Sequence, residues 1–232
     1  MGEPCTFVRA SGELDLGSIG VDECGKSDYF GPLVVAACHL LPEEVESLGP
    51  LPLSGRIPVE TCLAFDKQIR KSSRFAVVSI PPDKYNKLAK QLGSIAKMMT
   101  WANSQALAAI REKTECPDVF GKELGNKEAV RLLLSGQGFE VNIEDGERVK
   151  SQASYTAAGI LARAEFVRQS EKLQQPLGEV LPRGANENVV NFASNLVQAH
   201  GKGVLSGLAK VHFRTTDKVL KLAVQGQPPP KG

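Results

Sequence analysis

Blocks of hydrophobic and polar residues along the chain predict strands interleaved with helices. Short apolar runs bounded by turn residues indicate buried strands, and longer stretches with apolar residues three and four apart indicate amphipathic helices. The predicted strands span residues 18–23, 33–40, 74–80 and 139–145, with a short strand end at 116–121. The predicted helices span residues 60–72, 83–113 with a break near Gly93, 126–138, 153–173 and 187–200, and a last amphipathic segment follows His212. This order predicts an α/β domain with a mixed sheet flanked by helices and a helical C-terminal portion.

The two ends of the chain and one internal segment lack such patterns. Residues 1–16 are polar without a clear period and are interpreted as a short lead-in. Residues 225–232, QGQPPPKG, are expected to form a flexible tail, and residues 42–59, rich in Pro and Gly, a loop. The expected organisation is therefore one domain over residues 17–224.

The composition is that of a soluble globular protein. Hydrophobic residues make up 42% and charged residues 23%, which excludes wholesale disorder. The net charge of +2 excludes binding by bulk positive charge but permits a locally basic groove. No apolar run approaches the ~20 residues of a membrane span, and the N-terminus lacks a secretory pattern. Five cysteines without a CxxC pair argue against disulfides or a zinc site and indicate a cytoplasmic protein with reduced thiols.

Residues 20–27, GVDECGKS, match the phosphate-loop pattern GxxxxGK[ST] letter for letter. In that motif, backbone N–H groups surround phosphates at the start of a helix. Here Asp22 and Glu23 would place two negative charges inside the cradle, and a strand rather than a helix is predicted to follow. Nucleotide hydrolysis at this loop is therefore not expected.

Asp22 and Glu23 instead close an apolar strand beside a Gly-rich turn. Carboxylates at the end of a central strand are well placed to bind Mg²⁺ through their oxygens. Adjacent strand residues point to opposite faces, so both side chains reach one site only where the strand ends or bulges. An ordinary acidic turn is the alternative interpretation.

Glu165 lies on an apolar face of the predicted helix over residues 153–173, together with Ala158, Leu161 and Ala162. A carboxylate in such a place is costly unless it is paired or binds a metal. A metal site and an ion pair, for which Arg168 is a candidate, both remain open. Asp118, in CPDVFG, has little context of its own and is compatible with a turn residue.

The C-terminal segment KVHFRTT alternates basic groups with Phe213 and hydroxyls. If the segment is extended, Lys210, His212 and Arg214 share one side and form a short basic stripe for phosphates. A solvated edge is the alternative.

The segment GVDECGKSDYFGPLVVAA closely resembles the first active-site segment of type 2 ribonucleases H, and of ribonuclease HIII in particular. The segment LPRGANENVVNFASNLVQAHGKGVLSGLAKVHFRTTDKVL resembles the closing segment of the same family. PDKYNKL, WANSQAL, DVFG and AAGILARAEF fall between them in the family's order. The resemblance covers about residues 18–222 and is far more specific than the phosphate-loop match.

The resemblance implies a ribonuclease H-like fold and an endonuclease that hydrolyses the RNA strand of RNA/DNA hybrids. It implies two divalent ions, Mg²⁺ with Mn²⁺ as an alternative, and products with 5′-phosphate and 3′-hydroxyl ends. It further implies that the turn with Gly25, Lys26, Ser27 and Tyr29 contacts nucleic acid and senses the ribose 2′-hydroxyl, although a solvated turn lysine is the plain reading of Lys26. Its catalytic, metal-binding acids correspond to Asp22, Glu23, Asp118 and Glu165.

The sequence also departs from the family pattern. A basic Asp-Ser-Lys-Lys-Leu-like motif has no clear copy, DVFG stands where Asp-Gln-Phe is usual, and GERVKSQASY lacks the acid of a Lys-Ala-Glu-Ser segment. The N-terminal substrate-binding domain usual for ribonuclease HIII has no room in this chain, so we expect a fragment or a shortened form. No membrane or obligate protein partner is indicated. The alternative function is a hybrid-binding module with weak catalysis.

Overall fold

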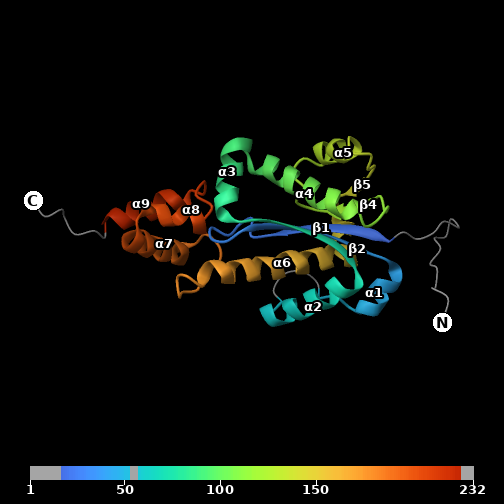
Figure 1. The fold of residues 1–232 in the computed structure, drawn as a ribbon, viewed down its shortest axis with the longest axis horizontal. Helices are drawn as coiled ribbons and strands as arrows, with labels where there is room; N and C mark the ends of the chain where they lie inside the picture. The colour runs from blue at the N-terminus through green and yellow to red at the C-terminus, as the bar shows by residue number, and fades with distance from the viewer. Residues whose placement is uncertain (1–16, 53–56, 226–232) are drawn as a thin grey trace, which may run out of the picture. The chain divides into compact units, whose positions relative to one another are not determined.

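The computed structural model describes residues 17–52 and 57–225, and its centre is a five-stranded sheet (Figure 1). The strand order across the sheet is β3-β2-β1-β4-β5. β1 pairs antiparallel with β2 and parallel with β4, and β4 pairs parallel with β5, so the sheet is mixed as predicted. The strands are β1 (Ser18–Cys24), β2 (Leu33–Leu40), β3 (Arg74–Ile80), β4 (Asp118–Gly121) and β5 (Asn142–Glu144).

The helices follow the apolar periodicity of the sequence closely. Gly93 ends one helix in the left-handed region at φ +66, which explains the predicted break, and Asn186 caps another by accepting a hydrogen bond from the N–H of Val189. None of the described helices has the length and apolar composition of a membrane span. The helices are α1 (Pro42–Leu48), α2 (Val59–Ser72), α3 (Pro82–Leu92), α4 (Ile95–Arg111), α5 (Lys127–Ser135), α6 (Ala153–Gln174), α7 (Glu187–His200), α8 (Leu205–Leu208) and α9 (Thr215–Gln225), with short 3-10 helices η1 (Glu147–Ser151) and η2 (Lys202–Val204).

The chain forms two compact units. Of the described residues, unit 1 comprises those up to Cys24, those of Val34–Val78 and Ser94–Glu165, and unit 2 comprises Gly25–Leu33, Ser79–Gly93 and those from Phe166 to Gln225. The expected single domain over residues 17–224 thus spans both units.

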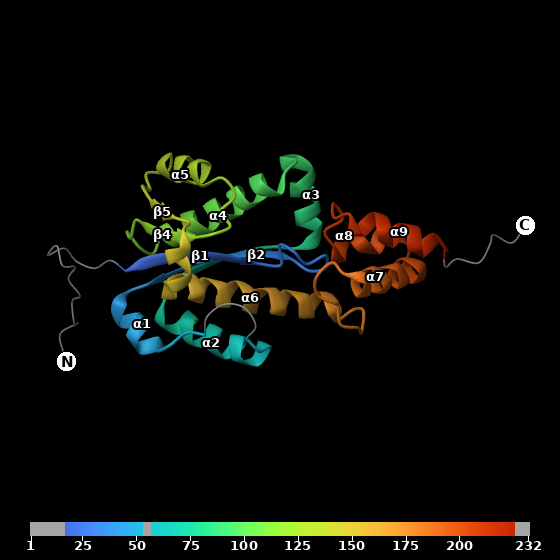
Figure 2. The same cartoon turned by 180° about the vertical axis from the view of Figure 1, so that it is seen from behind.

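Unit 1 has three layers around the sheet. α4 and α5 lie on one face, and α2 with the first part of α6 lies on the other (Figures 1 and 2). Every residue of β2 is buried, as expected for a central strand with helices on both faces. In β1 the buried residues Ile19–Val21 are followed by the half-buried acids Asp22 and Glu23, which are the candidate functional residues of this strand.

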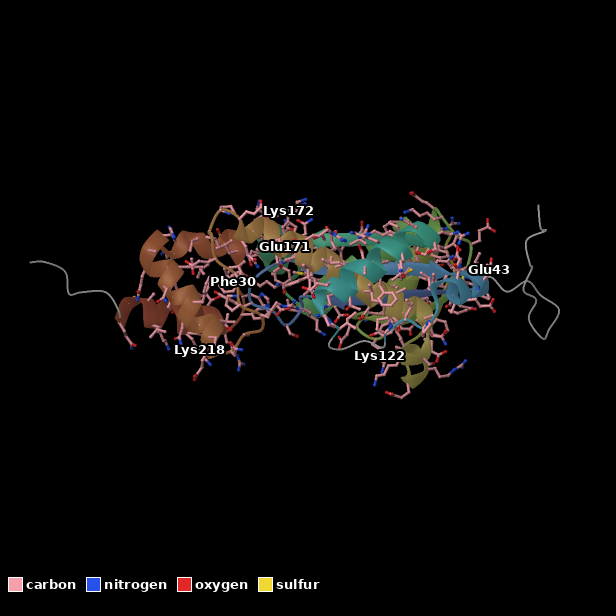
Figure 3. All side chains as sticks on the ribbon, turned by 90° about the horizontal axis from the view of Figure 1, so that it is seen from below. Phe30, Glu43, Lys122, Glu171, Lys172 and Lys218 are labelled. Atoms are coloured by element: carbon pink, nitrogen blue, oxygen red, sulfur yellow. The ribbon has the colours of Figure 1, made fainter. Side chains whose placement is uncertain are left out.

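Unit 2 is mainly helical and has its own core. α7 packs against α9, and α3 against α8. Tyr29 and Phe30, from the turn between β1 and β2, join this core with residues of α7 and α9, and Figure 3 labels Phe30. The rings of Phe30 and Phe192 meet edge to face at 5.7 Å. The turn is therefore part of the hydrophobic core of unit 2 and not a loose loop.

Three local predictions differ from the structure. The predicted loop over residues 42–59 contains α1, which starts with a proline at its first turn, and the predicted strand over residues 139–145 is ordered as a strand only in β5. The helix predicted from residue 83 was expected to be capped by Asp83, but Asp83 lies in the first turn of α3, whose N-cap is Pro81. The lead-in 1–16 and all of the predicted tail except Gln225, which ends α9, lie outside the described residues.

Candidate active site

Three carboxylates gather where β1 and β4 end. The two strands run parallel, and Val21 pairs with Gly121. Asp22 and Glu23 are among the last residues of β1, while Lys122 and Glu123 follow directly after β4. Parallel neighbours end at the same edge of a sheet, which is where ligands bind in open α/β sheets. Asp22, Glu23 and Glu123 therefore share one edge of unit 1.

Helix α6 comes into close contact with Asp22. The hydroxyl of Tyr155 donates a hydrogen bond to Asp22 Oδ1 at 3.1 Å. A Cβ atom at Gly159 would lie 2.6 Å from Asp22 Oδ2, so only glycine permits this approach. Asp22 is thereby held between its own strand and one face of α6.

Burial makes Asp22 hard to ionise. The pKa of its carboxyl is raised from 3.8 to about 6, mainly by desolvation and to a smaller extent by the charge of Glu123. Hydrogen bonds from the main chain and side chain of Glu23 and from Tyr155 act in the opposite direction. Desolvation and the charge of Asp22 also raise the pKa of Tyr155, so its hydroxyl stays protonated as a donor. A cation bound here would compensate the negative charge of Asp22 and Glu123.

The loop after β4 is fixed to α4. The side-chain amide of Asn103 donates to the carbonyl oxygen of Glu123 at 3.1 Å, and Thr100 Oγ1 accepts from the N–H of Asn126 at 2.8 Å. Gly125 has φ +76, and a Cβ there would lie 2.4 Å from the carbonyl oxygen of Ala96. Glu123 is therefore held by a rigid loop and not by a flexible one.

The structure does not bring Asp118 to Asp22. Asp118 begins β4, and its neighbour Val119 pairs with Ile19 near the start of β1. Asp118 is therefore aligned with Ser18, which lies four residues, or roughly 13 Å, before Asp22 along β1. Its carboxylate instead accepts a hydrogen bond at 3.0 Å from Asn142 on β5.

Glu123 was missed in the sequence. The signal that singled out Asp22 and Glu23, acids directly after an apolar strand, applies to it equally, because it follows DVFG by two residues. The motif resemblance drew attention to the aspartate that begins DVFG instead. The strand register shows that the acid after the segment, and not the acid before it, reaches the shared edge.

Glu165 pairs with α2. Its Oε2 lies 3.9 Å from Nη2 of Arg70, whose Nε is bonded to Asp66 at 2.9 Å. Glu165 follows Gly159, the α6 residue against Asp22, by six positions, which is about 9 Å along the helix axis and roughly 240° around it. This supports the ion-pair alternative. Among the described residues, no group of three or more His, Cys, Asp and Glu side chains is arranged to hold a metal. The four acids predicted together therefore do not form one cluster, and Asp22, Glu23 and Glu123 do not form a closed metal-binding group either.

The turn after β1 belongs to unit 2, and only some of its residues that were expected to contact nucleic acid are exposed. Gly25 is buried with φ +88, Lys26 is half-buried and Ser27 is exposed. Tyr29 is fully buried, and its hydroxyl lies 3.0 Å from Thr216 Oγ1, so the prediction that Tyr29 contacts nucleic acid is corrected: it anchors the core. β2, and no helix, follows the turn, as expected when the phosphate-loop match was rejected.

The predicted basic stripe does not form. Lys210 is 0% exposed, so it cannot reach a phosphate. Its neighbour Ala209 forms a single bridge with Phe30, and the chain then turns and enters α9 at Thr215 instead of staying extended. His212 and Arg214 are exposed. The ring of His212 lies 5.4 Å from that of Tyr85, and partial burial and the charge of Lys210 lower its pKa.

Comparison with known proteins identifies the family. No protein-family model matches the chain. The curated ribonuclease HIII of Chlamydia abortus is 30% identical over 217 residues, which are 90% of this chain and 72% of that protein. The chain belongs to the ribonuclease HIII family. The ribonuclease HIII of Protochlamydia amoebophila is 26% identical and matches 92% of this chain and 72% of that protein. The predicted resemblance and the expected enzyme class, a ribonuclease, are thereby confirmed.

Solved structures agree with the family assignment. The crystal structure of Bst-RNase HIII in complex with Mn²⁺ has a TM-score of 0.81 and 26% identity, and the match covers 91% of this chain and 71% of that chain. Ribonuclease H2 from Pyrococcus horikoshii OT3, at 18% identity and a TM-score of 0.72, shows the same fold. The predicted ribonuclease H-like mixed sheet flanked by helices is confirmed.

The hydrogen bond from Tyr155 gives a first prediction for this member of the ribonuclease HIII family. Tyr155→Phe is expected to lower activity on the substrate proposed below about tenfold, because a partner that orients a ligating carboxylate typically matters by 10–100-fold. Thr156→Ala, which removes a hydroxyl that donates to the carbonyl oxygen of Gln152 at 3.4 Å, is the matched control and should stay within about threefold of wild type. Equal rates for Tyr155→Phe and wild type would contradict the orienting role.

The ion pair of Glu165 gives a second prediction. Glu165→Gln is expected to keep activity within about threefold of wild type and to lower the melting temperature by about 2–4 °C, because a partly exposed pair contributes up to ~1 kcal/mol. Glu171→Gln, an exposed acid on the same helix, should change neither quantity. Loss of activity in Glu165→Gln without a change in melting temperature would show that Glu165 belongs to the active site.

Proposed function

We propose that this chain is an endonuclease that hydrolyses the RNA strand of RNA/DNA hybrids with the help of divalent cations. The observation that supports this most is the half-buried, desolvated carboxyl of Asp22, near Glu123 at the shared end of two parallel strands. A desolvated carboxyl with a raised pKa beside a second carboxylate is costly in its charged form, and a compensating cation would stabilise that form. Membership of the ribonuclease HIII family indicates the class of reaction, and the acids at the shared end of β1 and β4 indicate where it would take place.

The donor set fits Mg²⁺ or Mn²⁺. Asp22, Glu23 and Glu123 offer carboxylate oxygens, the ligands that these hard cations prefer. Two such ions at the site would supply an activated water and stabilisation of the leaving 3′ oxygen, which leaves 5′-phosphate and 3′-hydroxyl ends. In the protein itself, Tyr155 orients Asp22, and the loop tied to Asn103 orients Glu123. We propose Glu123 in place of Asp118 and Glu165 in the metal-binding set.

Nucleic-acid contacts are proposed for basic and hydroxyl groups of unit 2 that are exposed or half-buried. The candidate side chains can donate hydrogen bonds to phosphate oxygens and ribose hydroxyls. They are Lys26 and Ser27 from the turn, and His212 and Arg214 before α9. Because the pKa of His212 is lowered, Lys26 and Arg214 are the cations of this set, and the logarithm of the binding constant should fall with the logarithm of salt concentration at a slope of about −2. A cytoplasmic location, where thiols stay reduced, is part of this proposal.

A hybrid-binding module with weak catalysis is the second candidate. The absence, among residues 17–52 and 57–225, of a preformed group of three metal-binding side chains favours it. A titration of end-labelled hybrid with Mg²⁺, Mn²⁺ or EDTA decides between the two. Cleavage of the RNA strand with either metal and none in EDTA supports the endonuclease, whereas binding without cleavage supports the module. A protein that neither binds nor cleaves the hybrid would contradict both candidate functions.

A further inference from the structure

Lys210 is a buried lysine at the centre of unit 2. Its side chain is 0% exposed, and its ammonium group donates hydrogen bonds to the main-chain carbonyl oxygens of Asp28 at 2.9 Å and Gly31 at 2.7 Å, with that of Phe30 at 3.5 Å. The ring of Tyr85 lies 5.5 Å from the nitrogen on another side. All three carbonyls come from the turn between β1 and β2, so one ammonium binds the turn as a cation binds a ring of oxygens.

The same turn is held from two further directions. Arg183 donates from Nε and Nη2 to the two carboxylate oxygens of Asp28 at 3.1 and 3.0 Å, and the N–H of Gly184 donates to the same carboxylate. The N–H of Lys210 donates to the carbonyl oxygen of Tyr29 at 2.8 Å, and the N–H of Gly31 donates to that of Leu208 at 2.9 Å. These contacts fix residues 28–31 from the inside and leave Lys26 half-buried and Ser27 exposed.

Removal of the ammonium would affect the turn before anything else. Three carbonyl oxygens would lose a buried donor, and a buried acceptor without a partner is unfavourable enough to make the chain move. The backbone beside Lys210 would stay in place, because the side chain of Asn86 bonds Ala209 and Val211 at 2.9 and 3.0 Å. The turn would keep its bonds to Arg183, Gly184 and the main chain but lose the donor shared by three of its carbonyl oxygens, so the change in conformation should fall on the turn.

We propose that Lys210 is a positioning residue for substrate recognition, which acts through the turn and not by contact with nucleic acid. Its ammonium sets the conformation in which Lys26 and Ser27 meet the backbone of the hybrid. This inference rests on the proposed function, because it assumes that the turn contacts the substrate. It replaces the phosphate contact that the sequence suggested for the same residue.

The test is the kinetics of hybrid cleavage by Lys210→Met, which keeps the length of the side chain and removes its donors. KM is expected to rise about tenfold or more, with kcat within about threefold of wild type, because the turn binds substrate and the carboxylates of unit 1 are untouched. Ser194→Ala, which removes a buried hydroxyl bonded to the carbonyl oxygen of Val219 at 3.1 Å, is the control in the same unit. It should lower the melting temperature without changing KM.

A double-mutant cycle separates positioning from general stability. If Lys210 acts through the turn, Ser27→Ala should raise KM in the wild-type background but add little in Lys210→Met. Should Lys210→Met fail to fold, Lys210→Gln, which retains a donor, is measured in the same way and should show the same non-additivity. A normal KM, or effects that add fully, would overturn the inference. Failure of the wild type itself to cleave or bind hybrid would instead overturn the proposed function.

Discussion

Asp22→Asn is expected to reduce hybrid cleavage by at least about 10³-fold and to leave the metal-free protein as stable as wild type or more stable. The loss follows because removal of a carboxylate that holds the cation forfeits several kcal/mol of transition-state stabilisation, and each 1.36 kcal/mol is tenfold in rate. The gain in stability follows from the buried position of Asp22, where its negative charge is desolvated and faces Glu123.

The pH dependence of that gain follows from the pKa of Asp22. Its folded-state pKa of about 6 lies above the ordinary value of 3.8, so the folded state binds the proton more tightly than the unfolded chain. The contribution of Asp22 to stability is therefore most favourable below about pH 4 and is lost as the pH rises to about 6. Asparagine carries no such charge, and the difference in melting temperature between Asp22→Asn and wild type should grow over this window and then stay constant.

Melting curves without metal from pH 4 to 8, together with cleavage rates at pH 7.5, check both parts. Added Mg²⁺ should raise the melting temperature of wild type above pH 6 and not that of Asp22→Asn, because ligand binding stabilises only the state that binds it. Near wild-type cleavage by Asp22→Asn would remove Asp22 from the site. A melting temperature well below that of wild type at every pH would contradict the picture of a desolvated charge.

Glu123→Gln is expected to lower hybrid cleavage by about 10²–10³-fold, whereas Asp118→Asn should stay within about threefold of wild type. The contrast follows from the register of β1 and β4, which places Glu123 beyond the Val21–Gly121 pair and Asp118 near the start of the sheet. Initial rates on one labelled hybrid at saturating Mg²⁺ measure it. The opposite order, with Asp118→Asn inactive and Glu123→Gln active, would restore the assignment that the motif alone suggested.

The sheet and most helices could be predicted because their signals are local. Apolar runs bounded by turn residues place β1, β2 and β3 within one residue, and a capping asparagine and a left-handed glycine mark the helix ends at 186 and 93. The short helix α1 was missed because its segment is rich in Pro and Gly, although proline is well tolerated in the first turn of a helix.

The site was harder to predict because it depends on register. Asp22 and Glu23 were found from a strand that ends in acids, but the choice between Asp118 and Glu123 depends on which end of β4 meets the end of β1. Glu165 resembled a ligand because its face of α6 is apolar, yet it pairs with Arg70, a residue far away in sequence.

Lys210 shows the same difficulty for binding residues. Alternation of basic residues in KVHFRTT suggested a stripe, but alternation has meaning only in an extended chain, and this segment enters a helix instead. Lys210 is buried against the main-chain carbonyls of Asp28 and Gly31, which are far away in sequence and could not be predicted from the local pattern.

A calorimetric titration of Mn²⁺ into the metal-free protein tests the central claim most directly, because it measures the cation site without relying on catalysis. We expect wild type and Asp118→Asn to bind Mn²⁺ with the same affinity and Glu123→Gln to bind at least about tenfold more weakly. Equal affinity in wild type and Glu123→Gln, or no binding by wild type, would contradict a metal site formed by the acids at the shared end of β1 and β4.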